Sequence, residues 1–151
     1  MEIFGKGVLL KGTSGVGKSE TALALIDRGH LLIADDIVIF EKLDSQRIVG
    51  NCPKNLLNLL EVRGLGILNV SDLFGPQILK NKALLDVVID LISQASNEPV
   101  LSPLYSQESI MGLSVPKITL PISPGRNMAL LIETAVRHFQ FSQSSKQVTN
   151  L

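Results

Sequence analysis

The sequence predicts an α/β domain built on a mixed β-sheet, and three patterns support this prediction. Residues 7–10 form an apolar run that is followed directly by a glycine-rich loop and then by a segment with helical periodicity. Residues 84–92 are apolar and rich in β-branched side chains, as expected of a central strand. Residues 37–50 contain two extended runs around a polar turn, which indicates a hairpin and therefore an antiparallel component in the sheet.

The composition limits the size and the partners of this domain. A chain of 151 residues fits one domain, which we place at residues 1–141 with a mobile tail at residues 142–151. Hydrophobic residues make up 45% and charged residues 19% of the chain, a balance that favours self-association into a homo-oligomer. Fourteen basic and fourteen acidic residues leave no net positive field, so we do not expect nucleic acid as a partner.

The sequence also predicts a cytoplasmic protein. Residues 1–6 lack the basic and apolar regions of a signal peptide, and no apolar run approaches the ~20 residues of a membrane span. Cys52 is the single cysteine and cannot form an internal disulfide, which suits a reducing compartment. We therefore expect neither secretion nor a membrane partner.

The glycine-rich loop is a phosphate-binding loop (P-loop). It consists of Gly12, Thr13, Ser14, Gly15, Val16, Gly17, Lys18 and Ser19. Its glycines allow backbone N–H groups to converge on phosphate oxygens, Lys18 can reach the β- and γ-phosphates, and the Ser19 hydroxyl can ligate Mg²⁺. The loop predicts binding of a nucleoside triphosphate, and a chance match is the alternative. Residues 19–28 should form the following helix, whose positive N-terminal end faces the phosphates.

Two adjacent acids follow the next predicted element. Residues 31–34 are expected to form a short buried strand that ends at Asp35 and Asp36. Because side chains alternate along a strand, we expect one carboxylate to face the phosphates while the other is structural or tunes its partner's pKa. A turn or a solvated cap is the alternative interpretation of this pair.

The elements of the second half are less regular. Residues 56–60 suit a short helix or a strand, and Gly64 and Gly66 should break the chain before residues 67–70. We expect an irregular excursion at residues 93–109 and, because of its two prolines, an edge strand at residues 115–122. Asn127 should cap a last helix, whose apolar stripe consists of Met128, Leu131, Ile132, Ala135, Val136 and Phe139.

Phosphoryl transfer needs a proton acceptor, a metal on the phosphates and cations that spread the developing charge. Asp35, Asp36, Glu61, Arg63 and Arg126 are the candidates. Glu61 and Arg63 lie on one side if the segment is extended, although a surface ion pair is the commoner reading. Arg126 belongs to a turn at the start of a helix, where an anion could bind backbone N–H groups; the alternative is that the turn has no binding role. We assign neither histidine to catalysis, and expect His30 to serve at the end of the first helix.

Together these segments resemble the catalytic domain of bacterial HPr kinase/phosphorylase. The resemblance runs from about residue 7 to about residue 139, and residues 61–66, with the sequence Glu-Val-Arg-Gly-Leu-Gly, carry it more specifically than the P-loop does. The other matching segments are residues 12–23, 28–30, 34–36, 115–119 and 124–127.

The resemblance implies a hexameric enzyme that uses ATP to phosphorylate a serine of the phosphocarrier HPr, or removes that phosphate with inorganic phosphate and releases pyrophosphate. It implies a P-loop nucleotide-binding fold similar to the core of phosphoenolpyruvate carboxykinase. It also implies roles for the candidate residues. Asp36, supported by Asp35, would be the base in the kinase direction and the acid in the reverse direction. Lys18 would bind the β- and γ-phosphates, and Arg63 would bind the group that is transferred. Ser19 and Glu61 would hold Mg²⁺, and the turn with Arg126 would serve dephosphorylation.

The sequence departs from the family pattern in three ways, and these departures favour alternatives to a bifunctional enzyme. The chain resembles the short family forms without an N-terminal domain, and it has no counterpart of the histidine that precedes the P-loop. The family's arginine before residues 115–117 is also missing, since no arginine occurs between Arg63 and Arg126; Val100, Ser102 or a neighbour takes its place. Phosphorolysis is therefore expected to be weak. The alternatives are a non-catalytic ATP-binding regulatory module and, ranked lowest, a kinase for a small metabolite.

Overall fold

The computed structural model describes residues 1–93 and 105–149. Within them, seven strands form the main sheet: β1 (Glu2–Ile3), β2 (Lys6–Gly12), β3 (Ile39–Lys42), β4 (Ile48–Asn51), β7 (Lys82–Ser93), β8 (Tyr105–Ile110) and β9 (Leu113–Ile122). A separate hairpin consists of β5 (Leu59–Val62) and β6 (Gly66–Asn69). The helices are α1 (Lys18–Asp27), α2 (Val70–Phe74) and α3 (Met128–Thr149), with short 3₁₀ turns η1 (Lys54–Leu56) and η2 (Pro76–Ile78).

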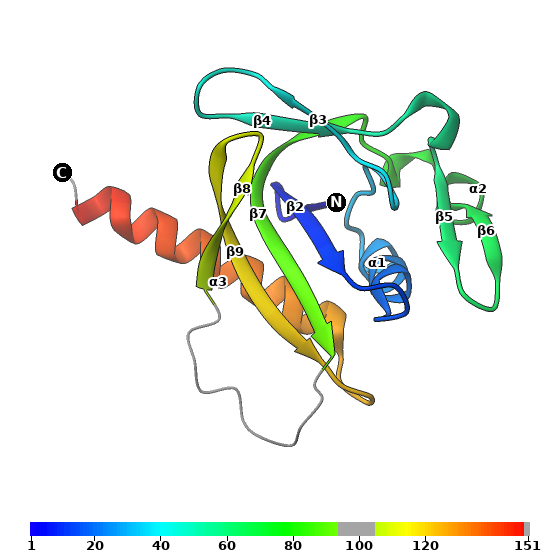
Figure 1. Ribbon diagram of the computed structural model, residues 1–151. Helices are drawn as coiled ribbons and strands as arrows, with labels where there is room; N and C mark the ends of the chain where they lie inside the picture. Colours follow the sequence, from blue (N-terminus) through cyan, green and yellow to red (C-terminus); the bar gives the residue numbers. More distant parts are fainter. Residues whose placement is uncertain (94–104, 150–151) are drawn as a thin grey trace.

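The long strand β7 is the centre of a mixed sheet, as predicted. It pairs in parallel with β2 and with β9, and antiparallel with β4 near its N-terminal end. The β3–β4 hairpin is antiparallel as well. Figure 1 shows α3 crossing behind β7 and β9, while α1 and the β5–β6 hairpin lie beyond β2, on the side away from β7. The α/β class with a mixed sheet is thus confirmed.

Side chains of β7 alternate between two layers of core because successive residues of a strand point to opposite faces. Val87, Ile89 and Leu91 belong to the cluster that contains α3, in which Ile132 and Val136 are fully buried. Val88 instead belongs to the cluster on the opposite face. The apolar stripe predicted for the last helix therefore packs against the sheet, as expected.

A third cluster attaches the β5–β6 hairpin to the first helix. Ala22 and Ile26 of α1 pack with Leu60 and Val62 of β5 and with Val70 of α2. These contacts fix the hairpin relative to the P-loop, because the loop leads directly into α1.

Two strand predictions were wrong. Residues 31–34 form no strand, because each neighbour reaches them at a single residue: Leu31 bridges Glu2 and Leu32 bridges Leu79. The strand at residues 115–122 is not at an edge, since β9 lies between β7 and β8. Its prolines are accommodated because Pro116 precedes the first β7 pair, at Lys117, while Pro121 lies beyond the last β8 pair.

Two other expectations were wrong in part. Residues 105–109 of the predicted excursion belong to β8, whereas residues 94–104 lie outside the described part of the chain. Most of the predicted tail is helical, because α3 continues to Thr149 beyond its apolar stripe. None of the helices in the described residues combines the length and the apolar character needed to cross a membrane.

Candidate active site

The P-loop joins β2 to α1 and has the backbone of an anion-binding loop. Gly15 and Gly17 have φ values of +82° and +101°, a left-handed conformation that glycine adopts without steric cost. Gly12 is required for packing, since a Cβ there would lie 2.6 Å from Cγ1 of Val16. Val16 itself is buried in the core. These two residues hold the loop in place and do not line the cavity beside it.

That cavity brings together three segments that are distant in the sequence. It has a volume of about 410 Å³, within the usual range of ligand sites. Its lining consists of Thr13, Ser14, Gly15, Gly17, Lys18, Ser19 and Glu20 from the loop and α1, together with Asp36, Glu61 and Arg63. Six of the predicted nucleotide-binding residues and three of the other candidates therefore surround one space. Glu20 was not singled out, although its place directly after Ser19 could have indicated it.

The two adjacent acids point to different surroundings. Asp36 lines the cavity, and its Oδ1 lies 3.7 Å from Nζ of Lys18. Asp35 instead accepts a hydrogen bond from the backbone N–H of Glu61, 3.0 Å from its Oδ2, and is not part of the lining. The expected divergence is present, but not through strand alternation: Asp36 has a φ of +56°, which turns the chain between the two residues.

The surroundings of Asp35 affect its charge. Burial raises the pKa of this carboxyl above its usual value, and the negative charge of Asp36 acts in the same direction. The N–H of Glu61 and the Lys18 ammonium oppose the rise. Because the hydrogen bond joins the Asp35 loop to β5, it also places Asp36 and Glu61 on the same side of the P-loop.

The β5–β6 hairpin supplies the other two candidates. Glu61 lies on β5 opposite Ile67 of β6, and Arg63 begins the turn. A Cβ built on Gly15 would lie 3.8 Å from Nη1 of Arg63, so the guanidinium extends over the P-loop. The positive φ values of Gly64 and Gly66 allow the turn that follows, as the sequence predicted.

The donor set suits a nucleotide phosphate with a hard metal ion. Lys18 and Arg63 supply positive charge and the loop supplies backbone N–H groups, while the Ser19 hydroxyl and the Glu61 carboxylate supply oxygen ligands. No group of three or more His, Cys, Asp or Glu side chains in the described part of the chain could hold a metal by itself. The two oxygens of Ser19 and Glu61 suit Mg²⁺, which commonly binds through one or two protein oxygens together with substrate phosphates.

Arg126 is not among the residues that line the cavity. It is exposed in the predicted turn, where its N–H lies 3.4 Å from the carbonyl oxygen of Ser123. Asn127 caps α3 as expected, since its Oδ1 accepts from the N–H of Leu130 at 3.1 Å. His30 is buried and its Nε2 lies 2.8 Å from Oε2 of Glu133, so its side chain connects α1 to α3 and does not only end the first helix.

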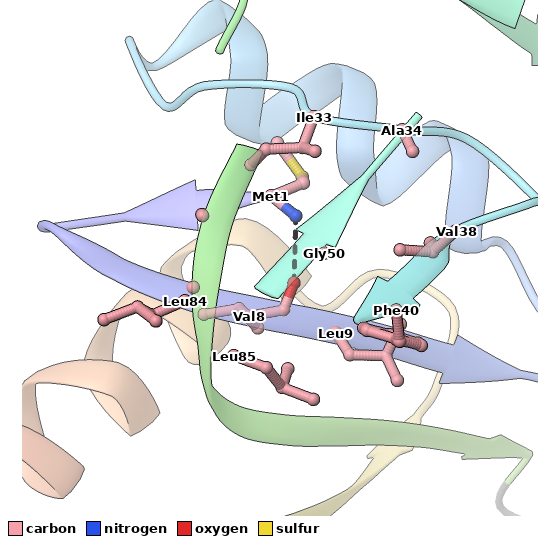
Figure 2. Close-up of a pocket in the computed structure, with 12 residues that line it drawn as sticks. Met1, Val8, Leu9, Ile33, Ala34, Val38, Phe40, Gly50, Leu84 and Leu85 are labelled. Atoms are coloured by element: carbon pink, nitrogen blue, oxygen red, sulfur yellow. Dashed lines mark hydrogen bonds between the residues drawn. The ribbon is translucent and has the colours of Figure 1, made fainter. Parts of the chain in front are cut away.

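An apolar recess lies farther along β2 (Figure 2). Val8, Leu9, Val38 and Phe40 are among its lining residues, and the Met1 amino group donates to the carbonyl oxygen of Val8 within it. Its volume is about 40 Å³, against about 410 Å³ for the cavity at the P-loop. No charged side chain of the described residues lines the recess, so the chemistry centres on the larger cavity.

Comparison with known proteins places the chain in a family. The family model "HPr Serine kinase C-terminal domain" matches residues 1–150. An HPr kinase/phosphorylase of Leptospira biflexa is 43% identical over 97% of this chain, and one of Burkholderia cenocepacia is 45% identical over 91%. The chain spans 47% and 43% of the length of these two relatives.

A solved structure supports the same family assignment. The Hpr(Ser) kinase/phosphatase from Coxiella burnetii superposes with a TM-score of 0.89 at 38% sequence identity, covering 98% of this chain and 91% of that one. The fold, the P-loop and the Glu61–Gly66 segment are thus accompanied by similarity along almost the whole chain. This chain belongs to the HPr serine kinase C-terminal domain family.

Proposed function

We propose that this chain is the catalytic domain of an ATP- and Mg²⁺-dependent protein kinase that phosphorylates a serine of an HPr-like phosphocarrier. One observation carries the proposal: the P-loop, Asp36 and the Glu61–Arg63 segment line a single cavity, although they come from three separate parts of the chain. The relatives of Leptospira biflexa and Burkholderia cenocepacia, both named HPr kinase/phosphorylase, support the same acceptor.

Binding and orientation of ATP fall to the loop and its two cations. The N–H groups of the loop and the Lys18 ammonium would bind the β- and γ-phosphates, and Arg63 would contact the group being transferred. Ser19 and Glu61 would hold Mg²⁺, which neutralises charge on the phosphates when bound. Most of the catalysis would come from positioning and charge stabilisation, since phosphoryl transfer requires little covalent chemistry from the protein.

Asp36 is the proposed proton acceptor. The acceptor serine oxygen would form a bond to the γ-phosphorus as the bond to the β-phosphate oxygen breaks, and the hydroxyl proton would pass to the Asp36 carboxylate. Lys18 lies close enough to Asp36 to stabilise the position of both groups. Asp35 supports this geometry through its hydrogen bond to the Glu61 N–H.

Phosphorolysis is the less supported half of the proposal. In this direction an oxygen of inorganic phosphate would form a bond to the phosphorus of the phosphoserine as the bond to the serine oxygen breaks, so that pyrophosphate forms, and Asp36 would return the proton to the serine oxygen. The turn with Arg126, which the resemblance assigns to this direction, does not line the cavity. We therefore propose that transfer from ATP is the stronger activity.

The deciding experiment is incubation of the purified protein with γ-labelled ATP, Mg²⁺ and a purified HPr protein, with the same HPr lacking its acceptor serine as the control. Label on the serine supports the kinase, and pyrophosphate released after addition of inorganic phosphate supports phosphorolysis. ATP binding without transfer would instead favour a regulatory module. Transfer of the label to an added hydroxylated metabolite, without any protein acceptor, would favour a metabolite kinase.

A further inference from the structure

Three exposed apolar side chains lie beside the charged residues of the cavity. Ile37 directly follows Asp36 and is 55% exposed. Ile67 is 69% exposed and lies directly opposite Glu61 in the β5–β6 pair, while Leu65 is 67% exposed in the turn that Arg63 begins. Each is thus next to a charged residue of the lining. We call Ile37, Leu65 and Ile67 the apolar rim.

Folding of the hairpin does not require the exposed side chains of the rim. The core-facing side of β5 consists of Leu60 and Val62, which are 0% and 3% exposed. Ile67 lies on the opposite face, because side chains alternate along a strand and Ile67 pairs with Glu61. Ile67 therefore adds nothing to this core, and a polar residue would suit its solvent-facing position equally well.

A hydrogen bond connects the two segments that carry the rim and complete the cavity. The hydrogen bond from the Glu61 N–H to Asp35 holds the loop of Ile37 against β5, at 3.0 Å. A single exposed apolar residue needs no explanation, since much of any protein surface is apolar. Ile37, Leu65 and Ile67, however, each lie on a segment that also contributes a charged residue to the cavity, and together they offer exposed apolar side chains that a neighbouring molecule can cover.

The position of the rim identifies what covers it. We propose that the apolar rim is the docking surface for the protein acceptor, and that it binds an apolar face of the acceptor next to the serine that is phosphorylated. This inference rests on the proposed function, because a serine on a folded protein can reach Asp36 only if its surroundings cover the edges of the cavity. A metabolite would fit within the cavity of about 410 Å³ and would not need the rim.

The test separates acceptor binding from nucleotide binding. In Ile67→Ser and Leu65→Ser, we expect the KM for HPr to rise about tenfold, as for a central interface contact, while the dissociation constant for ATP changes less than about twofold. Leu43→Ser is the matched control, because Leu43 is 55% exposed in the distant β3–β4 turn. Ile67→Leu keeps the apolar surface and should restore the KM of the unmodified protein.

Each result has one meaning. An unchanged KM in both serine variants, with an active unmodified protein, overturns the docking surface and leaves the proposed function intact. If the serine variants keep the KM but show a smaller particle mass by light scattering, the rim belongs to contacts between copies of the chain, and the docking surface is overturned as well. If the unmodified protein transfers no phosphate to HPr, the function and the inference fail together. Melting temperatures and ATP affinity show that each variant is folded.

Discussion

At the scale of single residues, the backbone of Asp36 determines which of the two acids reaches the cavity. The sequence indicated the P-loop by local pattern and the acids by their position, but strand alternation was the wrong reason for their divergence. A left-handed φ is uncommon outside glycine, although aspartate adopts it more often than most residues, and here it accompanies the hydrogen bond from the Glu61 N–H to Asp35. Such a contact spans 26 residues and cannot be derived from the neighbouring sequence.

Asp36→Asn tests the proposed base. We expect kcat for phosphoryl transfer to fall by about 10²–10⁴-fold, the usual contribution of a general base, with ATP affinity nearly unchanged. Asparagine tolerates a left-handed backbone, so the substitution removes the charge without straining the loop. Transfer assays and calorimetry measure the two quantities.

Lys18→Ala is the complementary variant, since it should weaken ATP binding itself through loss of the ammonium from the P-loop. Near-normal turnover in Asp36→Asn would rule out the base. An unchanged ATP affinity in Lys18→Ala would show that the loop does not bind the phosphates as proposed.

At the scale of elements, a buried ionic contact joins the first helix to the last. Glu133 of α3 is 7% exposed, and its carboxylate lies 2.5 Å from Nη2 of Arg28 and 2.8 Å from Nε2 of His30 at the end of α1. Burial alone would raise the pKa of Glu133, but the hydrogen bonds and charges of Arg28 and His30 outweigh it and hold this pKa below its usual value. The contact therefore stabilises the ionised form.

Glu133→Gln should lower the free energy of unfolding by about 1–3 kcal/mol at neutral pH, because Arg28 loses its partner and is itself only partly buried. A depressed carboxyl pKa stabilises the folded state above the unfolded pKa and loses this effect as the pH falls through the folded pKa. The unmodified protein should therefore lose more stability than Glu133→Gln below about pH 4.5, the ordinary pKa of glutamate.

Urea unfolding at several pH values measures this difference. Glu41→Gln is the control, since Glu41 is exposed on β3 and its substitution should leave the stability within about 0.5 kcal/mol. Parallel acid dependence of the two unfolding curves would contradict the role of Glu133.

The cap of α3 was predicted from sequence alone and gives a second test at this scale. Asn127→Ala should cost about 1 kcal/mol because the Leu130 N–H loses its acceptor, which for a chain of this size lowers Tm by roughly 2–4 °C. Asn127→Asp keeps an acceptor oxygen and should stay within about 0.5 kcal/mol of the unmodified protein. Thermal unfolding followed by circular dichroism compares them, and equal Tm values for both variants would show that the cap contributes nothing.

At the scale of the whole molecule, strand identities were easier to predict than strand neighbours. Apolar runs identified β2 and β7, and the polar turn identified the β3–β4 hairpin. The neighbours of β9 could not be predicted, because pairing with β7 and β8 involves residues far apart in the sequence. Prolines suggested an edge, yet each occupies a place where β9 has only one pairing partner among the described strands. Proline was correctly expected where a strand lacks a second partner, but β9 provides such positions near its two ends and not by lying at the edge of the sheet.

The largest remaining prediction concerns assembly. The mean hydropathy of +0.30 and the low charge content favour burial of surface between subunits. On α3, Leu130 and Phe141 are 48% and 71% exposed; they lie eleven residues apart, about three helical turns, and so share one side of the helix. We expect light scattering to give a mass several times 16.3 kDa, six times for the hexamer that the resemblance implies.

Phe141→Glu tests whether that side of α3 takes part in the assembly. A charge placed in an apolar contact between subunits would be buried without a partner, at a cost large enough to dissociate most interfaces. We therefore expect the mass of Phe141→Glu to fall while its helical content is kept, and the mass of Leu43→Glu, at an exposed position in the β3–β4 turn, to stay the same. A mass of 16.3 kDa for the unmodified protein at micromolar concentration would refute self-association, and an unchanged oligomer in Phe141→Glu would place the contact on another face.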